Sequence, residues 1–210
     1  MKEFNFFGHS SLKKITDAIF NQPFLYERLR PLFLGGLPIR DILDLLEANG
    51  SDIILDVGCG TGYMAEKIGF SRYTGIDNDP RMIKIAQNRK IPNAEFVLQD
   101  IRKYNFADVG PTKIVLYGVL HHLNDRDAIE LLKLLAHTTK QFIVSLDPVY
   151  AKYHLINNIL CELDRGAYVR TEEDMITLIS QTKLRVESKL VKYANTFIAK
   201  YLVLRLIPEI

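Results

Sequence analysis

Between residues 53 and 147, short apolar runs alternate with segments of helical periodicity, and this alternation limits the folds open to the chain. Parallel strands need a crossover connection, usually a helix, so such an alternation predicts a parallel sheet with helices on both faces. We therefore expect an α/β fold. The strands are expected at residues 53–57, 73–77, 95–100, 114–120 and 142–147, and the helices between them at residues 63–69, 80–89 and 126–137.

The flanking segments do not follow this rhythm. The first fifty residues predict an N-terminal helical extension, with helices at residues 10–20, 23–31 and 38–50, and its many aromatic side chains could serve either as core contacts or as a lid. After residue 147 a long connection is expected to carry a helix near residues 150–163. One more helix should follow from residue 171 to about 182. Two β-rich runs, residues 185–191 and 197–207, are separated by five residues and suit a hairpin.

Composition excludes several classes of protein. Hydrophobic residues make up 48% and charged residues 25%, which are globular values, and the net charge of +2 does not favour nucleic acid. The two cysteines lie far apart in the sequence, so a disulfide framework is not expected and a reducing compartment is. The apolar run at residues 197–207 is interrupted by Lys200 and Arg205 and is shorter than the ~20 residues a transmembrane helix needs. We expect a soluble, cytoplasmic protein.

A glycine loop, ILDVGCGTG at residues 54–62, links the first strand to the next helix, and two patterns compete for it. The dinucleotide pattern G-x-G-x-x-G/A with a later ribose acid is met by Gly60, Gly62, Ala65 and Asp77. The pattern acidic-x-G-x-G-x-G is met by Asp56, Gly58, Gly60 and Gly62. A carboxylate at Asp56 would repel a pyrophosphate, whereas it would favour the ammonium and sulfonium groups of S-adenosylmethionine. A nicotinamide-dependent oxidoreductase stays the alternative.

Three further segments follow the glycine loop in an order that resembles one family. They are GIDNDPRMI at residues 75–83, FVLQDI at residues 96–101 and IVLYGVLHHL at residues 114–123. Together with DVGCGTG at residues 56–62, they resemble the motifs of class I S-adenosylmethionine-dependent methyltransferases. The resemblance implies a Rossmann-like sheet of seven strands in the order 3-2-1-4-5-7-6, with strand 7 antiparallel, which also accounts for the closing hairpin. It implies S-adenosyl-L-methionine as the cofactor.

The resemblance also assigns roles to residues. Asp77 would hold the ribose hydroxyls and Asp100 would lie near the adenine amino group, although each could instead be an ordinary turn residue. Asp56 could simply cap the loop, and Cys59 beside it is expected to be a small filler and not a nucleophile. The complete set of expected cofactor-binding residues is Asp56, Gly58, Cys59, Gly60, Gly62, Asp77, Asn78, Met82, Asp100, Ile101 and Tyr117.

Two adjacent histidines, His121 and His122, would lie at the edge of the substrate pocket. Either could act as a general base, and the alternative is a structural histidine bonded to the backbone. No Cys, His or carboxylate has a ligand-like sequence spacing around them, so no metal site is expected. The long connection, which tends to cover the substrate in relatives, offers a further set of candidates for substrate contact: Tyr150, Tyr153, His154, Arg165, Tyr168 and Arg170.

The expected reaction is an in-line transfer of a methyl group to a small molecule, at an oxygen, carbon or nitrogen atom. Enzymes of this fold that methylate base amino groups carry Asn/Asp-Pro-Pro-aromatic after the fourth strand, where this chain has Tyr-Gly-Val-Leu at residues 117–120. No nucleic acid partner is expected, and the chain should be a monomer or homodimer. A non-catalytic binding module is the other alternative. We expect one domain over residues 1–210, with an extension at 1–50, a cofactor half at 51–147 and a substrate side at 148–210.

Overall fold

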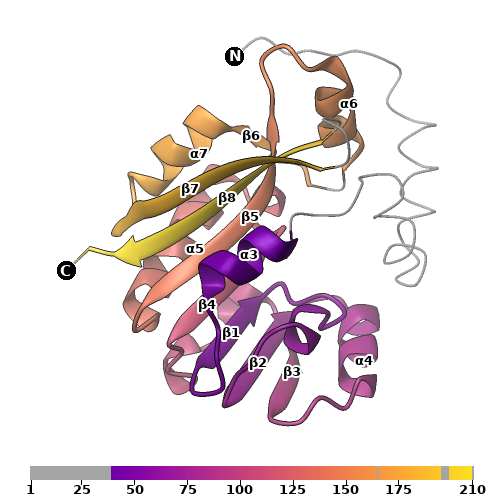
Figure 1. Cartoon of the computed structure of the whole chain (residues 1–210), viewed down its shortest axis with the longest axis vertical. Coiled ribbons are helices and arrows are strands. Elements are labelled where there is room, and N and C mark those ends of the chain that lie inside the picture. Colours follow the sequence, from indigo (N-terminus) through magenta and orange to yellow (C-terminus); the bar gives the residue numbers. More distant parts are fainter. Residues whose placement is uncertain (1–38, 165, 195–198, 210) are drawn as a thin grey trace.

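A computed structural model describes residues 39–164, 166–194 and 199–209, and its centre is a mixed β-sheet (Figure 1). The strands along the sheet follow the order β3-β2-β1-β4-β5-β8-β7, and a short β6 pairs with β5 off this path. Their bounds are β1 Ile53–Val57, β2 Arg72–Asp77, β3 Ala94–Leu98, β4 Lys113–Tyr117, β5 Phe142–Tyr150, β6 Arg170–Thr171, β7 Leu184–Ala194 and β8 Ala199–Pro208.

The parallel pairing places the carboxyl ends of β1, β2 and β4 side by side at one edge of the sheet. β1 pairs in parallel with β2 on one side and β4 on the other, so Val57 lies opposite both Ile76 and Leu116. The chain order reverses at β1, and in open α/β sheets ligands bind beyond the strand ends at such a point. β8 runs antiparallel to both β5 and β7, which closes the sheet with a hairpin.

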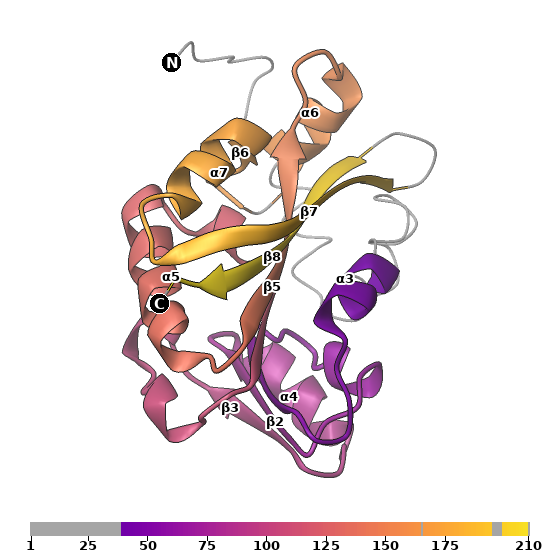
Figure 2. The same ribbon diagram turned by 60° about the vertical axis from the view of Figure 1, so that its left-hand side comes forward.

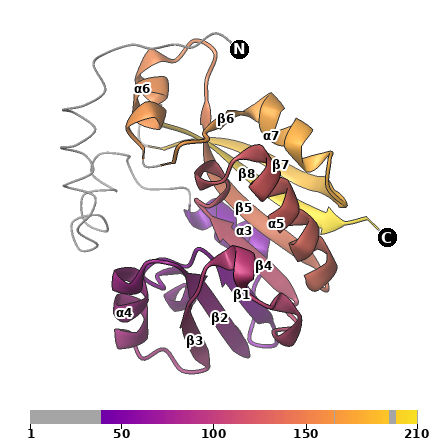
Figure 3. The same ribbon diagram turned by 180° about the vertical axis from the view of Figure 1, so that it is seen from behind.

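Helices cover both faces of the sheet. Successive side chains of its buried strands point to opposite faces, and each face forms one apolar cluster with the helices that cover it. Ile54 packs with the face that carries α3 (Ile39–Leu46) and α4 (Pro80–Asn88). Leu55 packs with the opposite face, which carries α5 (Asp125–Thr138) and α7 (Glu172–Ile179). Figure 1 shows α3 in front of the sheet, and Figure 3, seen from behind, brings α5 and α7 forward.

The helix α6 (Leu155–Leu163) follows β5 and contacts both β5 and β8 at one end of the sheet (Figure 2). It keeps part of its apolar surface exposed, and so does the turn before it. These exposed residues are Tyr153, Leu155, Ile156 and Ile159. Among the described residues no helix is long and apolar enough to cross a bilayer.

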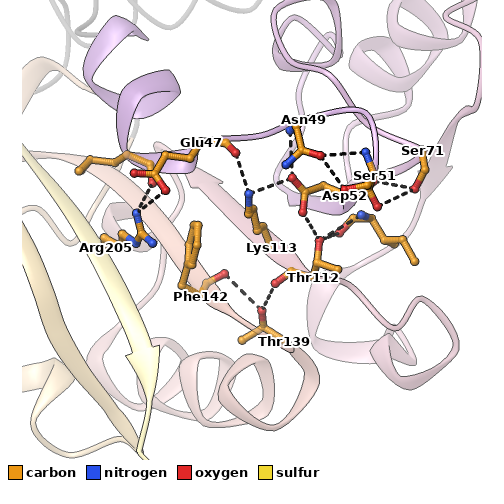
Figure 4. Close-up of polar contacts among 12 residues, drawn as sticks. Glu47, Asn49, Ser51, Asp52, Ser71, Thr112, Lys113, Thr139, Phe142 and Arg205 are labelled. Carbon is orange, nitrogen blue, oxygen red and sulfur yellow. Dashed lines mark hydrogen bonds and ion pairs between the residues drawn. The ribbon is translucent and has the colours of Figure 1, made fainter.

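The opposite edge of the sheet, where β1 and β4 begin, is closed by a polar network (Figure 4). Lys113 Nζ lies 2.8 Å from Asp52 Oδ2 and donates to the backbone oxygen of Glu47 at 2.7 Å. Thr112 donates its hydroxyl to Asp52 Oδ1 at 2.8 Å. The Lys113 and Asp52 side chains are only 6% and 4% exposed, so this is a buried, fully paired ion pair.

The expected α/β fold and strand order are confirmed, whereas several element bounds were wrong. The helix expected at residues 63–69 is only the 3-10 turn η1 (Met64–Glu66), because Gly62 and Gly69 bracket too short a segment. β4 ends at Tyr117, where Gly118 takes a φ of 71°, and the residues after it form the 3-10 turn η4 (Leu120–His122). β5 continues to Tyr150. The helices expected at residues 10–20 and 23–31 lie outside the described residues.

Candidate functional site

The glycine loop is held by backbone bonds and by close packing. The amides of Gly58 and Cys59 both donate to the backbone oxygen of Ile76, at 2.8 and 3.0 Å, which fastens the loop to the end of β2. Gly58 and Gly62 have a φ of 74°. A Cβ on Gly62 would also come within 2.8 Å of the Phe96 ring. Glycine is therefore required here by both conformation and space.

Asp77, the last residue of β2, joins this loop to the next one. Its Oδ2 accepts a hydrogen bond from the amide of Gly60 at 2.9 Å, and its Oδ1 accepts one from the amide of Asp79 at 2.8 Å. An ionised carboxylate has about four lone-pair sites, so these two bonds leave acceptor capacity for a ligand. Asp77 thus lies at the centre of the expected ribose site.

Asp56, near the end of β1, lies beneath the loop and is 1% exposed. Tyr73 donates its hydroxyl to Asp56 Oδ2, while Oδ1 has no hydrogen-bond partner within the described part of the chain. Burial raises the pKa of Asp56 from 3.8 to about 7; the Tyr73 hydrogen bond opposes this rise, and the charge of Asp77 adds to it. A buried acceptor without a donor is costly, and a cation nearby would favour its ionised form.

Cys59 is buried in the loop, and burial raises the pKa of its thiol, with the charges of Asp56 and Asp77 acting in the same direction. A protonated, buried thiol is a poor nucleophile. Its sulfur packs so closely on Gly75 that a Cβ there would lie 2.9 Å away. The geometry therefore agrees with a packing role for Cys59.

The other expected cofactor residues lie around the same edge in different environments. Asp100 caps the 3-10 turn η2 (Ile101–Lys103), and hydrogen bonds from the side chain and backbone of Arg102 lower its pKa to about 2. Asn78 is exposed, Met82 is buried on α4, and Ile101 and Tyr117 are half-buried. The adenine-side assignments stay predictions.

His121 is buried between two carboxylates. Its Nδ1 lies 2.8 Å from Asp147 Oδ1 and its Nε2 lies 3.2 Å from Asp164 Oδ1. Burial alone would lower the pKa of His121, but the hydrogen bonds and charges of Asp147 and Asp164 outweigh it and raise the pKa to about 9. His121 is thus protonated at neutral pH with both ring nitrogens engaged. The expectation that His121 or His122 acts as a general base stays a prediction, and the engaged ring nitrogens of His121 favour His122.

His122 is exposed, and its ring centroid lies 4.2 Å from that of His121. The loop that carries both histidines touches the glycine loop, since a Cβ on Gly58 would lie 2.7 Å from Val119 Cγ2. Asp164, distant in sequence, completes a group with both histidines whose possible ligand atoms all lie within 4.8 Å of one another. Sequence spacing, on which the expectation of no metal site rested, could not reveal this group.

The expected substrate residues divide into two groups. Tyr150, Tyr153 and His154 lie beside α6. Tyr150 donates to Glu162 in the last turn of the helix at 2.7 Å, and His154 caps its first turn. Tyr168 and Arg170 lie against η4 instead. Arg170 donates to the backbone oxygens of Leu120, Leu123 and Tyr168 and pairs with Asp125. Its guanidinium therefore clamps the loop of the two histidines. Arg165 lies outside the described residues.

Three residues of this region were missed in the sequence: Tyr73, Asp147 and Asp164. Asp147 could have been found, because it interrupts the apolar run of the fifth strand near its carboxyl end, as Asp56 and Asp77 do in theirs. Tyr73 reads as an ordinary buried strand residue, and Asp164 as a polar residue after a helix. Only the fold brings them to Asp56 and His121.

The residues present fit S-adenosylmethionine. The Asp56 oxygen that lacks a donor is complementary to a cationic ligand, and Asp77 retains acceptor capacity for a ribose diol. The left-handed glycines keep the loop bare of side chains where a ligand would approach. A pyrophosphate would instead bring negative charge towards Asp56 and Asp77 together.

Comparisons with known proteins point the same way. Residues 54–141 match the methyltransferase domain family. An uncharacterized protein of Methanocaldococcus jannaschii is 25% identical over 151 residues, covering 68% of this chain and 57% of that protein. The chain spans less than two thirds of the length of the curated relatives it matches first.

Two solved structures show the same fold. A methyltransferase solved with the Haloferax volcanii Trm112 methyltransferase activator has a TM-score of 0.73 at 14% identity, covering 95% of this chain and 99% of its own. Magnesium protoporphyrin IX methyltransferase from Synechocystis, with bound S-adenosylhomocysteine, has a TM-score of 0.64 at 15% identity, covering 94% and 100%. The chain thus carries a match to the methyltransferase domain over residues 54–141 and has the fold of solved methyltransferase structures.

Proposed function

We propose that this protein transfers a methyl group from S-adenosylmethionine to a small-molecule acceptor. When bound, the cofactor supplies a methyl group on a sulfonium, which passes in line to the acceptor atom as the carbon–sulfur bond breaks and S-adenosylhomocysteine is left. The acceptor's proton leaves to water or to a base. Residues 51–147 would bind the cofactor, and residues 148–210 would line the acceptor site.

The observation that carries this proposal is the convergence of Asp56, Asp77 and the glycine loop at the point where the strand order reverses. Asp77 is fixed by two backbone amides, so its free lone pairs are already oriented for a ribose diol. Asp56 places a buried carboxyl group where a positive charge would be favourable. Both residues bind and orient, and neither needs to enter the bond-making step.

His122 is the proposed base where the acceptor is a hydroxyl or an acidic carbon. It is exposed and lies on η4, directly after β4, in a loop that contacts the glycine loop through Val119. The neighbouring imidazolium of His121 is held by two carboxylates and cannot take the proton. No base is needed when the acceptor is already nucleophilic, because alignment supplies most of the rate enhancement.

The acceptor is proposed to be small and partly apolar. Exposed Tyr153, Leu155, Ile156 and Ile159 on and before α6 offer an apolar wall on the substrate side. The structural neighbour from Synechocystis acts, by its name, on a magnesium porphyrin, which supports the same acceptor class. The tyrosine-glycine sequence after β4 and the net charge of +2 argue against a nucleic acid acceptor.

The test is a thermal-shift titration with S-adenosylmethionine and S-adenosylhomocysteine, with NAD(H) and NADP(H) as controls. A ligand at a hundred times its Kd adds about 2.7 kcal/mol of stability. For a chain of this size the melting temperature should rise by roughly 5–11 °C. A rise with the two sulfur nucleosides alone supports the proposal and justifies an acceptor screen with radiolabelled methyl groups.

The alternatives give different outcomes. A rise with the nicotinamides alone would overturn the proposal in favour of an oxidoreductase. Binding of the sulfur nucleosides with no transfer to any acceptor would favour a non-catalytic binding module, or a need for a partner such as the activator bound by the Haloferax neighbour. Adding that class of activator would separate these two cases.

A further inference from the structure

The second cluster of chemistry-bearing side chains lies beside the cofactor site, around His121. Within the described residues, His121, His122 and Asp164 form a group whose nitrogen and oxygen atoms all lie within 4.8 Å of one another. The chain passes tightly over this group, because a Cβ on Gly166 would lie 2.0 Å from Cδ2 of His121. Two imidazoles and one carboxylate are a donor set that suits divalent transition metals.

The spacing of the donors is compatible with one metal ion. Nitrogen and oxygen ligands lie ~2.0–2.2 Å from Zn²⁺, so neighbouring ligands are roughly 3–3.5 Å apart in tetrahedral or octahedral geometry. His121 Nε2 and Asp164 Oδ1 are 3.2 Å apart. His122 offers a ring nitrogen within 4.8 Å of both of these atoms.

Asp147 supplies the support that metal-binding histidines usually have. A ligating histidine generally donates its other ring N–H to a carboxylate, which fixes the ring and its tautomer. Asp147 Oδ1 lies 2.8 Å from His121 Nδ1 and also accepts the backbone amide of His121 at 3.1 Å. Asp147 is 2% exposed and its Oδ2 has no hydrogen-bond partner among the described residues.

The loop that carries both histidines is fixed before any ligand binds. The amide of Tyr168 donates to the backbone oxygen of His121 at 3.0 Å. Arg170 donates to the backbone oxygens of Leu120 and Leu123 at 2.8 and 2.7 Å. Such backbone clamps hold a site in place, as a binding constellation requires.

The charges of the cluster also favour a dication. Asp147 and Asp164 bring two carboxylates to one imidazole, one at each ring nitrogen. A divalent ion with two neutral histidines would balance both. The ion would lie between His121 Nε2 and Asp164 Oδ1, which are 3.2 Å apart.

We propose that His121, His122 and Asp164 bind one divalent transition-metal ion, with Asp147 orienting His121 from behind. Three protein ligands leave coordination positions open to water or to an oxygen of an acceptor. The site goes beyond methyl transfer, and His122 could serve as the base proposed above only while no ion is bound to it. It also departs from the sequence expectation of no metal, which rested on spacing along the chain.

The test uses the full, tag-free protein after dialysis against a chelator. Zn²⁺ is titrated by calorimetry, and Co²⁺ is titrated while its visible d–d absorption is recorded. The variants are His122→Ala and Asp164→Asn, which change side chains that are not fully buried, and the control is His137→Ala, an exposed histidine in the last turn of α5. S-adenosylhomocysteine binding is measured in parallel as a check of folding.

We expect one equivalent of metal per chain and a loss of at least about tenfold in affinity for both variants, the lower bound seen even when outer partners of metal sites are removed. The control should bind like the parent. Absence of a stoichiometric equivalent, or equal affinity in all four proteins, would overturn the proposal, as would a Co²⁺ spectrum with thiolate character from Cys59 or Cys161. Failure of the nucleoside to bind would instead affect the proposed methyl transfer.

Discussion

Two aspartates at opposite ends of β1 have nearly the same burial and opposite environments. Asp52 is 3% exposed and Asp56 is 1% exposed. Asp52 accepts from Lys113, Asn49 and Thr112 (Figure 4), and although burial opposes it, these bonds lower its pKa. Among the described residues, Asp56 accepts a side-chain hydrogen bond from Tyr73 alone, and burial raises its pKa to about 7. The carboxylate at one end of the strand is thus fully paired, while Oδ1 of the carboxylate at the other end has no hydrogen-bond partner among the described residues.

The largest effect is expected when the buried ion pair between Lys113 and Asp52 is broken. Replacing Lys113 by Met leaves Asp52 as an uncompensated buried charge, which typically costs ~3–5 kcal/mol. The melting temperature should fall by roughly 6–20 °C for a chain of this size. Calorimetry or thermal denaturation measures this, and S-adenosylhomocysteine affinity below the melting transition should stay within about twofold of the parent, since binding free energies of distant groups are independent.

The double variant Asp52→Asn/Lys113→Met is the matched control for that prediction. It removes both charges, so it should recover part of the lost stability. Two results would contradict the prediction: a melting temperature of Lys113→Met equal to that of the parent, or a loss of cofactor-binding free energy larger than its loss of unfolding free energy. Either result would mean that stability and cofactor binding do not depend on different ends of the sheet.

The next effect concerns the ligand end. Replacing Asp77 by Ala removes a charged acceptor and should weaken nucleoside binding by ~1.5–3 kcal/mol, which is about 10–150-fold in Kd. Isothermal titration calorimetry with S-adenosylhomocysteine measures it. The matched control is Asp79→Ala, which removes the cap of α4 at Arg81 and should cost about 1 kcal/mol of stability with a smaller change in Kd. Equal affinities for parent and Asp77→Ala would remove Asp77 from the site.

The sequence contains a motif at one end of β1 and none at the other. Gly58, Gly60 and Gly62 lie in one short stretch of chain, where their positive φ angles fix the residue type and so leave a motif. The Lys113 and Asp52 pair joins residues that are distant in the chain, and nothing in either segment signals it. The parallel sheet was accessible from the alternation of helices and strands, and the strand order was accessible because the family resemblance implies it.

The candidate catalytic region shows the same limit. His121 and His122 were visible as a pair, but the contacts of His121 with Asp147 and Asp164 were not, because these residues come from β5 and from the end of α6. Helix bounds failed for a local reason at residues 63–69, where one 3-10 turn replaces the expected helix. Periodicity alone cannot distinguish so short a segment from a helix.

A change at Asp56 sharpens the comparison through pH. Because the folded-state pKa of Asp56 lies above its value of 3.8, its contribution to stability is full below pH 4 and is lost as the pH rises towards about 7. The side chain of Asp56→Asn does not ionise, so the variant does not lose stability in this pH range. Without ligand, its free energy of unfolding should exceed that of the parent by about 1–3 kcal/mol at pH 8 and should differ little at pH 4. Urea denaturation at both pH values measures the difference.

The same variant should bind S-adenosylmethionine more weakly at pH 8, because the neutral amide no longer attracts a cation. S-adenosylhomocysteine lacks the sulfonium charge and should lose less affinity. A variant that is less stable than the parent at pH 8, or that binds S-adenosylmethionine as well as the parent does, would contradict the assignment of Asp56 as an acceptor kept for a ligand.

The smallest effect is expected at Asp100, whose carboxylate is already engaged by Arg102. The guanidinium lies 2.6 Å from Oδ2, and both the backbone amide and Nε of Arg102 donate to Oδ1 at 3.0 Å. A neutral adenine amino group must share this acceptor, so Asp100→Ala should weaken S-adenosylhomocysteine binding by only about 0.5–1.5 kcal/mol. Calorimetry on Asp100→Ala beside Asp77→Ala ranks the two residues. An equal or larger loss at Asp100 would show that the adenine side, and not the ribose acid, dominates recognition, and the contrast between paired and unpaired carboxylates would then fail as a guide to this site.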